Sequence, residues 1–452
     1  MSLTETSVPQ RIALDATGLA GLVDHGLRGH WAGRPVFVLT QFVDGGVARL
    51  AAELSQVDAH VVGVLSAVPP GPGAPAIAPV WFPDDGSDAD TWLADPPARL
   101  SAWLDRIDPE RRAVIAGGNF TAVGSVCGRP VHGWRRPEWV RLEDKTAIDR
   151  LWQHVGVPAP AHVVLPVGDT TAAERVRELD RGAGVVVALD ATTGNRGDAK
   201  GLRWVRAGEE LAGALRWAEG KADRVRIAEF VPGVPCSVLA MVLGDGVAVF
   251  DPIEIVTLRD PRTADLVFCG SSTWWRPDAA VRDEIREHVR RVGRHIGQEL
   301  GYRGLFSVDG VLGADGFRAT ELNPRHASGL GLRQGWPDFP LYLVQRAVQE
   351  SVPGIAGLPS ADIESIFRQI VADHPSLSVV VPLEDVADGE GVWQGTVRYR
   401  VRGGRAHVLD AGPPREDGAV APVVAAFATA TGARRLAAFD TPVPLTDFRR
   451  FP

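Results

Sequence analysis

The sequence predicts an α/β (α+β) fold with an N-terminal α/β lobe, a two-lobed core and a small β-rich C-terminal extension. Strand-like and helix-like runs alternate over the first part of the chain, which is typical of parallel βαβ units. The core ends in an acid-bearing hairpin pattern, and past Glu350 mainly hairpin-like runs remain. We place the boundaries at residues 1–140, 141–350 and 351–452, and divide the core into 141–228 and 229–350. A chain of 452 residues is long enough for roughly two to four domains.

The N-terminal lobe is predicted from two apolar runs with a helical pattern between them. A segment rich in Pro, Gly and Asp follows and predicts a loop, because its prolines cannot continue a helix. Strands are expected over Pro35–Thr40, His60–Ser66 and 112–116, helices over 46–54 and 91–107, and the loop over 68–90.

The core continues the alternation, and two long strands near residue 230 are expected to pair with each other. Past Glu350, two strand-like runs flank a Gly403-Gly404 turn, a pattern typical of a hairpin. Strands are expected over 162–165, Val185–Leu189, 202–206, 225–231, 236–243, 247–250, 392–402 and 405–411. Helices are expected over 142–154, Ala172–Leu179, 208–220 and 278–300, with Lys145 near the start of the first.

Charge and cysteine content narrow the class of protein. A net charge of -8 gives no electrostatic reason to expect nucleic acid or an anionic membrane as partner. The three cysteines are far apart and form no CxxC pair, which indicates a reducing compartment and argues against a zinc site. Neither a signal-peptide pattern nor an apolar run of about 18 residues is present. We therefore expect a cytoplasmic protein that binds neither nucleic acid nor membrane.

The chemistry concentrates in a predicted antiparallel hairpin whose turn lies at residues 313–316. Asp309 and Glu321 fall on neighbouring strands, and Asn323 shares the face of Glu321 because strand side chains alternate. Two carboxylates and an amide oxygen suit Mg²⁺, which prefers hard oxygen ligands and shares them with phosphates. Arg325 supplies a planar cation for a phosphoryl or carboxylate group. The alternative, a solvated hairpin without a function, stays open.

Asp309 and the E-x-N-P-R run from Glu321 to Arg325 resemble the metal-binding segment of the ATP-grasp superfamily. Residues 140–335 are similar to that family in the order of their elements, and the preceding lobe resembles the family's N-terminal domain. The resemblance implies that Asp309, Glu321 and Asn323 bind Mg²⁺, with Mn²⁺ as a substitute, and that Arg325 contacts the transferred phosphoryl group. Lys145 resembles the family's first nucleotide lysine, although lysines are usually solvated.

Two further segments resemble the family's nucleotide-binding parts. Glu229-Phe230-Val231 resembles the hinge that reads adenine, although an ordinary strand is the alternative. The loop at residues 192–197 resembles the flap over the phosphates, in which Gly194, Arg196 and Gly197 would approach the nucleotide.

The chain departs from the family twice. The strand Val185–Leu189 lacks the family's second lysine, which Lys200 or Arg196 would replace, and no acid near Val234-Pro235 is placed to hold the ribose.

The resemblance implies a Mg-ATP-dependent carboxylate–amine ligase. ATP would phosphorylate a carboxylate, and an amine would attack the acyl phosphate to form an amide or peptide bond, releasing ADP and phosphate. Substrates would be amino acids or a small peptide, near His326, Ser328 and Arg333. His326 is a general base or a bystander, and Trp274 and Trp275 line a pocket or simply pack. A carboxylase, a purine-type ligase and a non-catalytic nucleotide-binding protein are the alternatives. The sequence does not identify which acid and which amine are joined. It also leaves open the oligomeric state (a homodimer is one option) and the role of residues 351–452.

Overall fold

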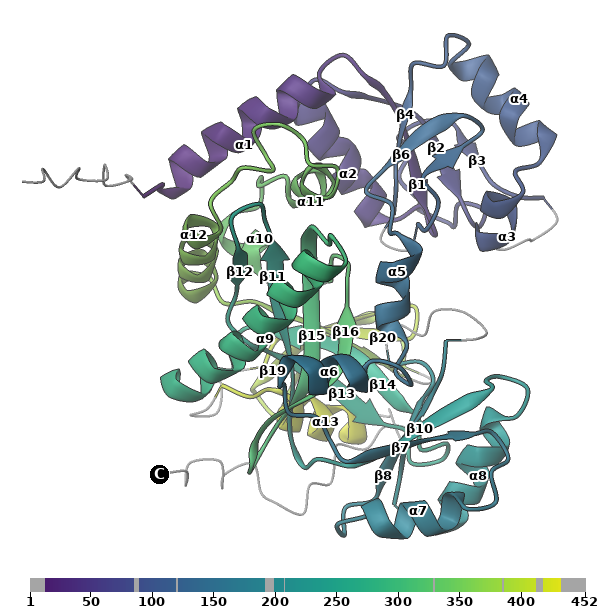
Figure 1. The fold of residues 1–452 in the computed structure, drawn as a ribbon, viewed down its shortest axis with the longest axis vertical. Helices are drawn as coiled ribbons and strands as arrows, with labels where there is room; N and C mark the ends of the chain where they lie inside the picture. The colour runs from purple at the N-terminus through teal and green to yellow at the C-terminus, as the bar shows by residue number, and fades with distance from the viewer. Residues whose placement is uncertain are drawn as a thin grey trace, which may run out of the picture.

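The computed structural model describes residues 13–84, 89–118, 121–191, 199–206, 208–327, 330–383, 386–411 and 418–431. The strands in these ranges form three sheets (Figure 1). The first lies in the N-terminal lobe, the second is small and antiparallel, and the third is large and runs through the centre of the molecule. This mixed architecture confirms the predicted α/β class, whereas the exact domain boundaries stay a prediction.

The N-terminal sheet has the strand order β3-β2-β1-β4-β6-β5, with β2 and β4 both parallel to the central β1. The predicted βαβ unit is confirmed, since β1 and β2 flank α2. Its strands are β1 (Pro35–Thr40), β2 (His60–Ser66), β3 (Val80–Trp81), β4 (Val114–Ala116), β5 (Ser125–Val126) and β6 (Arg129–His132). Its helices are α1 (Ala16–Trp31), α2 (Gly45–Gln56), α3 (Ala89–Ala94) and α4 (Ala98–Ile107).

Three details of this lobe differ from the sequence prediction. The single helix expected over 91–107 is two helices, α3 and α4, because Pro96-Pro97 interrupts the backbone hydrogen bonding of a continuous helix. The loop expected over 68–90 contains the short strand β3 and the start of α3. The sequence analysis also missed α1, whose first turn is capped by the Asp15 carboxylate, which accepts from the Gly18 N–H at 2.7 Å.

The small sheet is antiparallel, with the order β7-β10-β8-β9. Its elements are β7 (His162–Pro166), α7 (Ala172–Leu179), β8 (Val185–Leu189), β9 (Leu202–Val205), α8 (Gly208–Ala218) and β10 (Arg224–Glu229). The expected pairing of the two long strands is wrong, because β10 belongs to this sheet and β11 (Gly233–Val242) to the large one. Residues 230–232 connect them as an extended segment ending in Pro232, which cannot form the tight turn that a hairpin needs.

The large sheet has the order β16-β15-β11-β13-β14-β17-β20-β19-β18, with β12 paired to β11. Its core strands are β11, β12 (Val247–Val249), β13 (Ile253–Arg259), β14 (Leu266–Ser272), β15 (Gly304–Gly313) and β16 (Gly316–Asn323). The C-terminal strands β17 (Leu377–Pro382), β18 (Gly389–Trp393), β19 (Val397–Arg402) and β20 (Arg405–Asp410) continue the sheet through the β14–β17 pair. The strand expected over 392–402 breaks at Gln394-Gly395, where both residues have a positive φ and form a turn.

Helices cover the large sheet and connect it to the lobes. These are α5 (Pro137–Val140), α6 (Asp149–Val155), α9 (Ala279–Glu299), α10 (Leu332–Gly335), α11 (Leu341–Gln349), α12 (Ser360–Asp373) and α13 (Ala421–Ala430). The 21-residue α9, which packs on β11 and β12, is the longest in the described ranges. None of the helices described is both long and apolar enough to cross a membrane.

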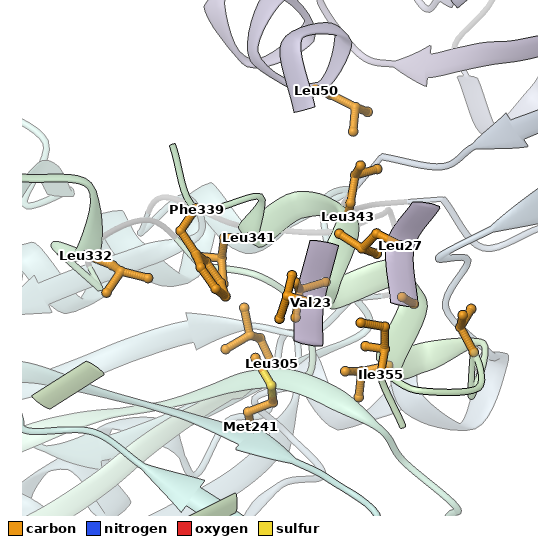
Figure 2. Packing of buried hydrophobic residues seen from close by; sticks show 14 of the residues in the cluster. Val23, Leu27, Leu50, Met241, Leu305, Leu332, Phe339, Leu341, Leu343 and Ile355 are labelled. Carbon is orange, nitrogen blue, oxygen red and sulfur yellow. The ribbon is translucent and has the colours of Figure 1, made fainter. Parts of the chain in front are cut away.

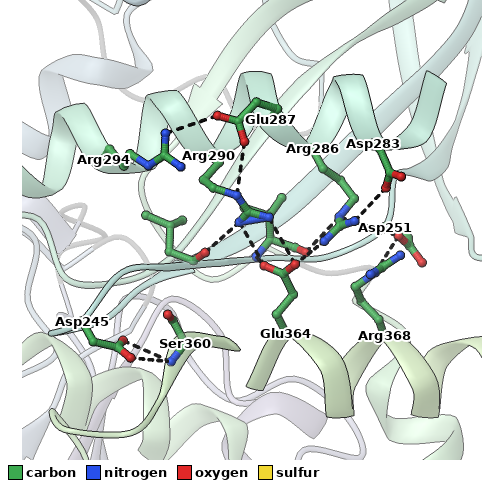
Figure 3. A network of polar contacts seen from close by, with 12 residues as sticks. Asp245, Asp251, Asp283, Arg286, Glu287, Arg290, Arg294, Ser360, Glu364 and Arg368 are labelled. Carbon is green, nitrogen blue, oxygen red and sulfur yellow. Dashed lines mark hydrogen bonds and ion pairs between the residues drawn. The ribbon is translucent and has the colours of Figure 1, made fainter. Parts of the chain in front are cut away.

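A charged network fixes α12 to α9 and to the back of the sheet (Figure 3). The Glu364 carboxylate of α12 accepts from the Val249 N–H at 2.8 Å and from Arg290 at 3.0 Å, and it also pairs with Arg286. Arg368, one turn further along α12, donates to Asp251 at 2.8 Å. These charged groups pair with one another, and Glu364 also accepts from a strand N–H. We therefore assign the network a structural role.

The N-terminal lobe shares a hydrophobic core with the large sheet (Figure 2). Val23 and Leu27 of α1 and Leu50 of α2 belong to the same buried cluster as Leu343 of α11 and Leu305 of β15. A buried Leu contributes about 1.5–3 kcal/mol, so this shared cluster holds the two parts in a fixed arrangement. Strand β6 of the N-terminal sheet consequently lies beside α11.

Candidate functional site

The predicted hairpin forms, and its polar residues lie on one face of the large sheet. Asp309 of β15 is directly opposite Glu321 of β16, and Ser307 is opposite Asn323. All four side chains line a cleft of about 240 Å³ between the small and large sheets. The prediction that two acids and an amide converge is therefore confirmed.

Asp309 lies at the centre of this cluster. Its Oδ1 accepts from Ser237 Oγ of β11 at 2.6 Å, and its Oδ2 accepts from Asn323 Nδ2 at 3.0 Å. Burial and the neighbouring Glu321 charge raise the pKa of the Asp309 carboxyl above its ordinary value, because both disfavour the ionised form. Lys145 and Arg325 offset part of the repulsion between the two carboxylates, and a divalent cation bound between them would relieve the rest.

Lys145 is the nearest cation to the acid pair. Its Nζ lies 2.7 Å from Glu321 Oε1, and its side chain is 9% exposed. The prediction that Lys145 opens a helix is wrong. Residues 145–148 form a turn before α6, because the Asp144 carboxylate accepts from both the N–H and the hydroxyl of Thr146 and holds the chain in a local turn. This turn directs the lysine into the cleft.

Arg325 is anchored by two neighbours. Its Nε donates to Glu143 Oε1 at 2.9 Å, and a terminal nitrogen donates to Asn323 Oδ1 at 2.9 Å. Glu143, which belongs to the short 3₁₀ helix η1 (Arg141–Glu143), also accepts from Arg135 at 2.5 Å. Arg325 thus lines the cleft in an orientation set by fixed hydrogen bonds. Sequence reasoning missed Glu143 and Ser237, since nothing local in either segment marks them.

The predicted hinge residues line the other end of the cleft. The Glu229 carboxylate accepts from the Ala161 N–H at 3.0 Å, and the Phe230 N–H donates to the Gly184 carbonyl at 3.1 Å. The Phe230 ring stacks on Trp204 with 3.9 Å between centroids. Phe230 is therefore 8% exposed and packs mainly within the small lobe, while Val231 also lines the cleft.

The strand without a lysine faces the same cleft through Val186 and Ala188. Directly opposite Ala188 on the neighbouring strand is Arg226, a cation that the sequence analysis did not single out. Arg226 lines the cleft, but Asp149 binds it with two hydrogen bonds of 2.6 and 2.8 Å. Side chains alternate between the two faces of a strand, so the position of Arg226 along β10 was the sequence signal that could have identified it. Lys200 is exposed beside Ala199 of the cleft wall, whereas Gly194, Arg196 and Gly197 lie outside the described residues.

Of the residues predicted to contact substrate, His326 and Arg333 both lie beside the Tyr342 ring. His326 is half-buried, 4.8 Å from the Tyr342 ring, and lines a second, smaller cavity. Burial and the charges of Arg346 and Arg325 lower the pKa of His326 to about 4, so its ring is neutral at pH 7. Arg333 lies 5.5 Å from the Tyr342 ring centroid. Ser328 falls outside the described residues, and Trp274 and Trp275 pack in hydrophobic clusters.

Comparisons with solved structures find proteins of similar architecture. An L-amino acid ligase from Bacillus licheniformis matches at a TM-score of 0.54, with 12% identity over 90% of this chain and 98% of that chain. The N5-carboxyaminoimidazole ribonucleotide synthetase from Thermus thermophilus matches at 0.51, with 17% identity over 88% and 98%. The chain has the ATP-grasp fold.

A third ATP-grasp neighbour is the biotin carboxylase domain of a 2-oxoglutarate carboxylase from Hydrogenobacter thermophilus, solved with MgADP, ADP and bicarbonate. It matches at a TM-score of 0.50, with 14% identity over 70% of this chain and 69% of that chain. No family model and no curated protein sequence matches the chain. At these identities the likeness establishes the ATP-grasp fold, with its two sheets facing each other across the cleft.

The residues at the hairpin fit a magnesium ion. In the described part of the chain, no cluster of three or more His, Cys, Asp or Glu side chains is arranged as a metal site. The cleft instead offers two carboxylates and one amide, the partial oxygen set that suits Mg²⁺ shared with phosphates and water. The Asn323 amide directs its nitrogen at Asp309 and its oxygen at Arg325, so binding a metal through that oxygen requires the amide to turn.

Proposed function

We propose that this protein is an ATP- and Mg²⁺-dependent ligase that joins a carboxylate to an amine through an acyl phosphate, releasing ADP and phosphate. The proposed substrates are amino acids or a small peptide, and the proposed compartment is the cytoplasm. The supporting observation is the constellation of Asp309, Glu321, Asn323, Lys145 and Arg325 in one cleft of the ATP-grasp fold.

Each residue of this constellation has a role in the proposal. Asp309 and Glu321, with Asn323, would hold the metal, which when bound neutralises phosphate charge and orients the terminal phosphoryl group. Lys145 would move from Glu321 to the nucleotide phosphates. Arg325, held by Glu143, would bind the substrate carboxylate and later the acyl phosphate. The cleft walls exclude water, which otherwise hydrolyses the acyl phosphate.

The second step of the proposed reaction must remove a proton from the amine. The amine nitrogen attacks the acyl carbon, the bond from that carbon to the phosphate oxygen breaks, and phosphate leaves with the bonding electrons. The attacking nitrogen must lose a proton. A general base works best when its pKa lies near the working pH, so His326, whose pKa is lowered to about 4, is a poor base at pH 7, and the departing phosphate can take the proton instead.

The deciding experiment is a phosphate-release screen with ATP, Mg²⁺ and pools of amino acids and small peptides. Hydroxylamine added with an active acid should give a hydroxamate, because it traps an acyl phosphate, and ATP should yield ADP. Formation of AMP and pyrophosphate would contradict the proposal. Turnover that requires bicarbonate would favour a carboxylase instead, and nucleotide binding without turnover under any condition would favour a non-catalytic role.

A further inference from the structure

The small sheet contributes a positive charge to the main cleft. Of the described residues that line this cleft, the basic ones are Lys145, Arg226 and Arg325. Lys145 pairs with Glu321 of β16, and Arg325 follows β16, so both belong to the large-sheet wall. Arg226 lies on β10 in the opposite wall, where the neighbouring strand β8 presents only apolar side chains to the cleft. In the described part of the small-sheet wall, Arg226 is therefore the only cation that a nucleotide can meet.

One carboxylate holds two of the three nitrogens of the Arg226 guanidinium. Nε donates to Asp149 Oδ2 at 2.6 Å, and Nη2 donates to Asp149 Oδ1 at 2.8 Å. Within the described residues, no group accepts from the third nitrogen, Nη1. Arg226 is only 5% exposed, yet it lines the cleft. A largely buried N–H donor normally has an acceptor, and the cleft is the side from which one can reach Nη1.

Asp149 belongs to the large-sheet side of the molecule. It begins α6, directly after the turn that carries Lys145, and α6 packs on α9. Trp152 of the same helix is part of the buried cluster of the large sheet. A second contact from the small sheet is His162 of β7, whose Nε2 lies 3.2 Å from Asp149 Oδ2. The carboxylate thus joins the two sides of the cleft, and its position sets the direction of the Arg226 guanidinium.

Arg226 can bind a phosphate without losing its partner. Lys145 would have to leave Glu321 to reach a nucleotide, whereas Arg226 offers Nη1 while Nε and Nη2 stay on Asp149. The guanidinium is planar and its donors have fixed directions, so a carboxylate that holds one edge also orients the rest. The pair avoids an unpaired buried charge before the nucleotide arrives. This cation is therefore preorganised in the cleft.

We infer that Arg226 binds the nucleotide phosphates through Nη1, and that Asp149 is the residue that positions it. The inference rests on the proposed ATP-dependent function and specifies its nucleotide site. ATP carries about four negative charges at neutral pH, and Mg²⁺ and Lys145 would meet them from the large sheet. Arg226 meets them from the small sheet. Asp149 thereby links nucleotide affinity to the relative position of the two sheets.

The test is calorimetry with Mg-ATP, ADP, AMP and adenosine. Arg226→Gln should weaken ATP binding about tenfold or more, as expected for a lost charge-assisted hydrogen bond, and should leave adenosine binding within about twofold of wild type. A purely structural role would weaken all four ligands by the same factor. Asp149→Asn should weaken ATP binding about threefold or more and also spare adenosine, because Arg226 keeps its charge but loses one of its two anchors.

A second variant tests rescue. Ala188 lies directly opposite Arg226 in the β8–β10 register and also lines the cleft. Ala188→Lys in the Arg226→Gln background returns a cation to this place, and it should bring ATP affinity back to within about threefold of wild type. Arg224→Gln is the matched control, because Arg224 begins the same strand but is exposed and does not line the cleft. It should keep wild-type affinities, and thermal unfolding should show that each variant is folded.

Each outcome bears on one part of the inference. Unchanged ATP affinity in folded Arg226→Gln, or an equal loss for adenosine, overturns the role of Arg226. Unchanged or tighter ATP binding by Asp149→Asn overturns the positioning role of Asp149. If Arg226→Gln does not fold, Arg226→Lys carries the same test, since it keeps a charge beside Asp149 but loses Nη1. A wild type that binds no ATP overturns this inference and the proposed function together. ATP binding without phosphate release for any acid would reject the ligase proposal alone.

Discussion

Lys145 Nζ and Glu321 Oε1 lie 2.7 Å apart, although 176 residues separate them in the chain. Both side chains are largely buried, and the pair joins the turn before α6 to β16. Under the proposed function each group has a second partner, a phosphate for the lysine and a metal ion for the carboxylate. Binding of Mg-ATP therefore exchanges one ion pair for two and leaves no buried charge unpaired.

The first prediction concerns the metal. Glu321→Gln should lower turnover roughly 10³-fold or more, because an amide oxygen cannot replace the carboxylate charge opposite the phosphates. Folding should be retained, since the glutamine oxygen can still accept from Lys145. The measurements are phosphate release and thermal unfolding, and Asn323→Ala should behave similarly. Glu390→Gln, on the exposed β18, is a matched control that should keep wild-type rates. Near-wild-type ATP consumption by Glu321→Gln would falsify the proposed metal site.

A second prediction separates the two candidate phosphate lysines. Lys145→Ala should weaken ATP binding and turnover together, about tenfold or more each, because Lys145 lies in the cleft before the nucleotide arrives. Lys200→Ala should lower turnover more than affinity, since an exposed residue next to the flap engages only on closure. Calorimetry and steady-state kinetics distinguish the patterns. Wild-type behaviour of both Lys200→Ala and Arg196→Ala would mean that neither residue replaces the family's second lysine. Arg226, which lines the cleft opposite Ala188, would then be the next candidate.

The fold and the acid hairpin were predictable because their signals are local. Runs such as Val185–Leu189 have the period and apolar content of a strand, and the spacing from Asp309 to Glu321 is fixed by one turn. Local signals failed where two strands that follow each other in the chain belong to different sheets. The strands β10 and β11 look like a hairpin in sequence, yet they belong to different sheets. Pairing of this kind is decided by the tertiary structure.

The supporting residues of the site were not predictable for the same reason. Glu143 becomes important only because Arg325, 182 residues later, reaches it. Arg346 reads as an ordinary polar residue of an amphipathic helix, and only the docking of the N-terminal lobe buries it against Gly117. Lys145 was identified from its resemblance to the family's first nucleotide lysine, but the turn that directs it depends on the Asp144 side chain.

The third prediction is a pH dependence that originates at Glu53. Its pKa is raised from 4.5 to about 7, so the folded state binds more protons than the unfolded state between these values. The stability from Glu53 is thus full below about pH 4.5 and is lost as the pH rises through 7. Glu53→Gln keeps an acceptor for the Leu343 N–H but does not titrate. Relative to wild type, the variant should therefore gain up to about 3 kcal/mol of unfolding free energy between about pH 4.5 and 8.

Urea unfolding of both proteins across this pH range measures the effect. Taking the difference between variant and wild type cancels His132 and His326, whose lowered pKa values act in the opposite direction. For these histidines the unfolded state binds the extra protons, so their contribution rises with pH up to about 6.5. A difference that stays constant with pH would mean that Glu53 is ionised in the folded protein.

The last prediction concerns Gly133, which packs against Arg346. Gly133 has a φ of +80°, and a Cβ added there would lie 2.4 Å from Arg346 Cγ. Gly168 has a similar φ of +87° but open space around its missing Cβ. Gly168→Ala should therefore cost only the backbone strain, about 1–2 kcal/mol. Gly133→Ala should cost a further ~1–3 kcal/mol, because Arg346 or the strand end must shift.

Urea unfolding of the two alanine variants measures these losses. Gly168 lies in the loop after β7, so Gly168→Ala reports the backbone strain alone. Equal stability losses in the two variants would show that Arg346 adapts to the added methyl group, and the close packing of Gly133 against Arg346 would then carry no stability.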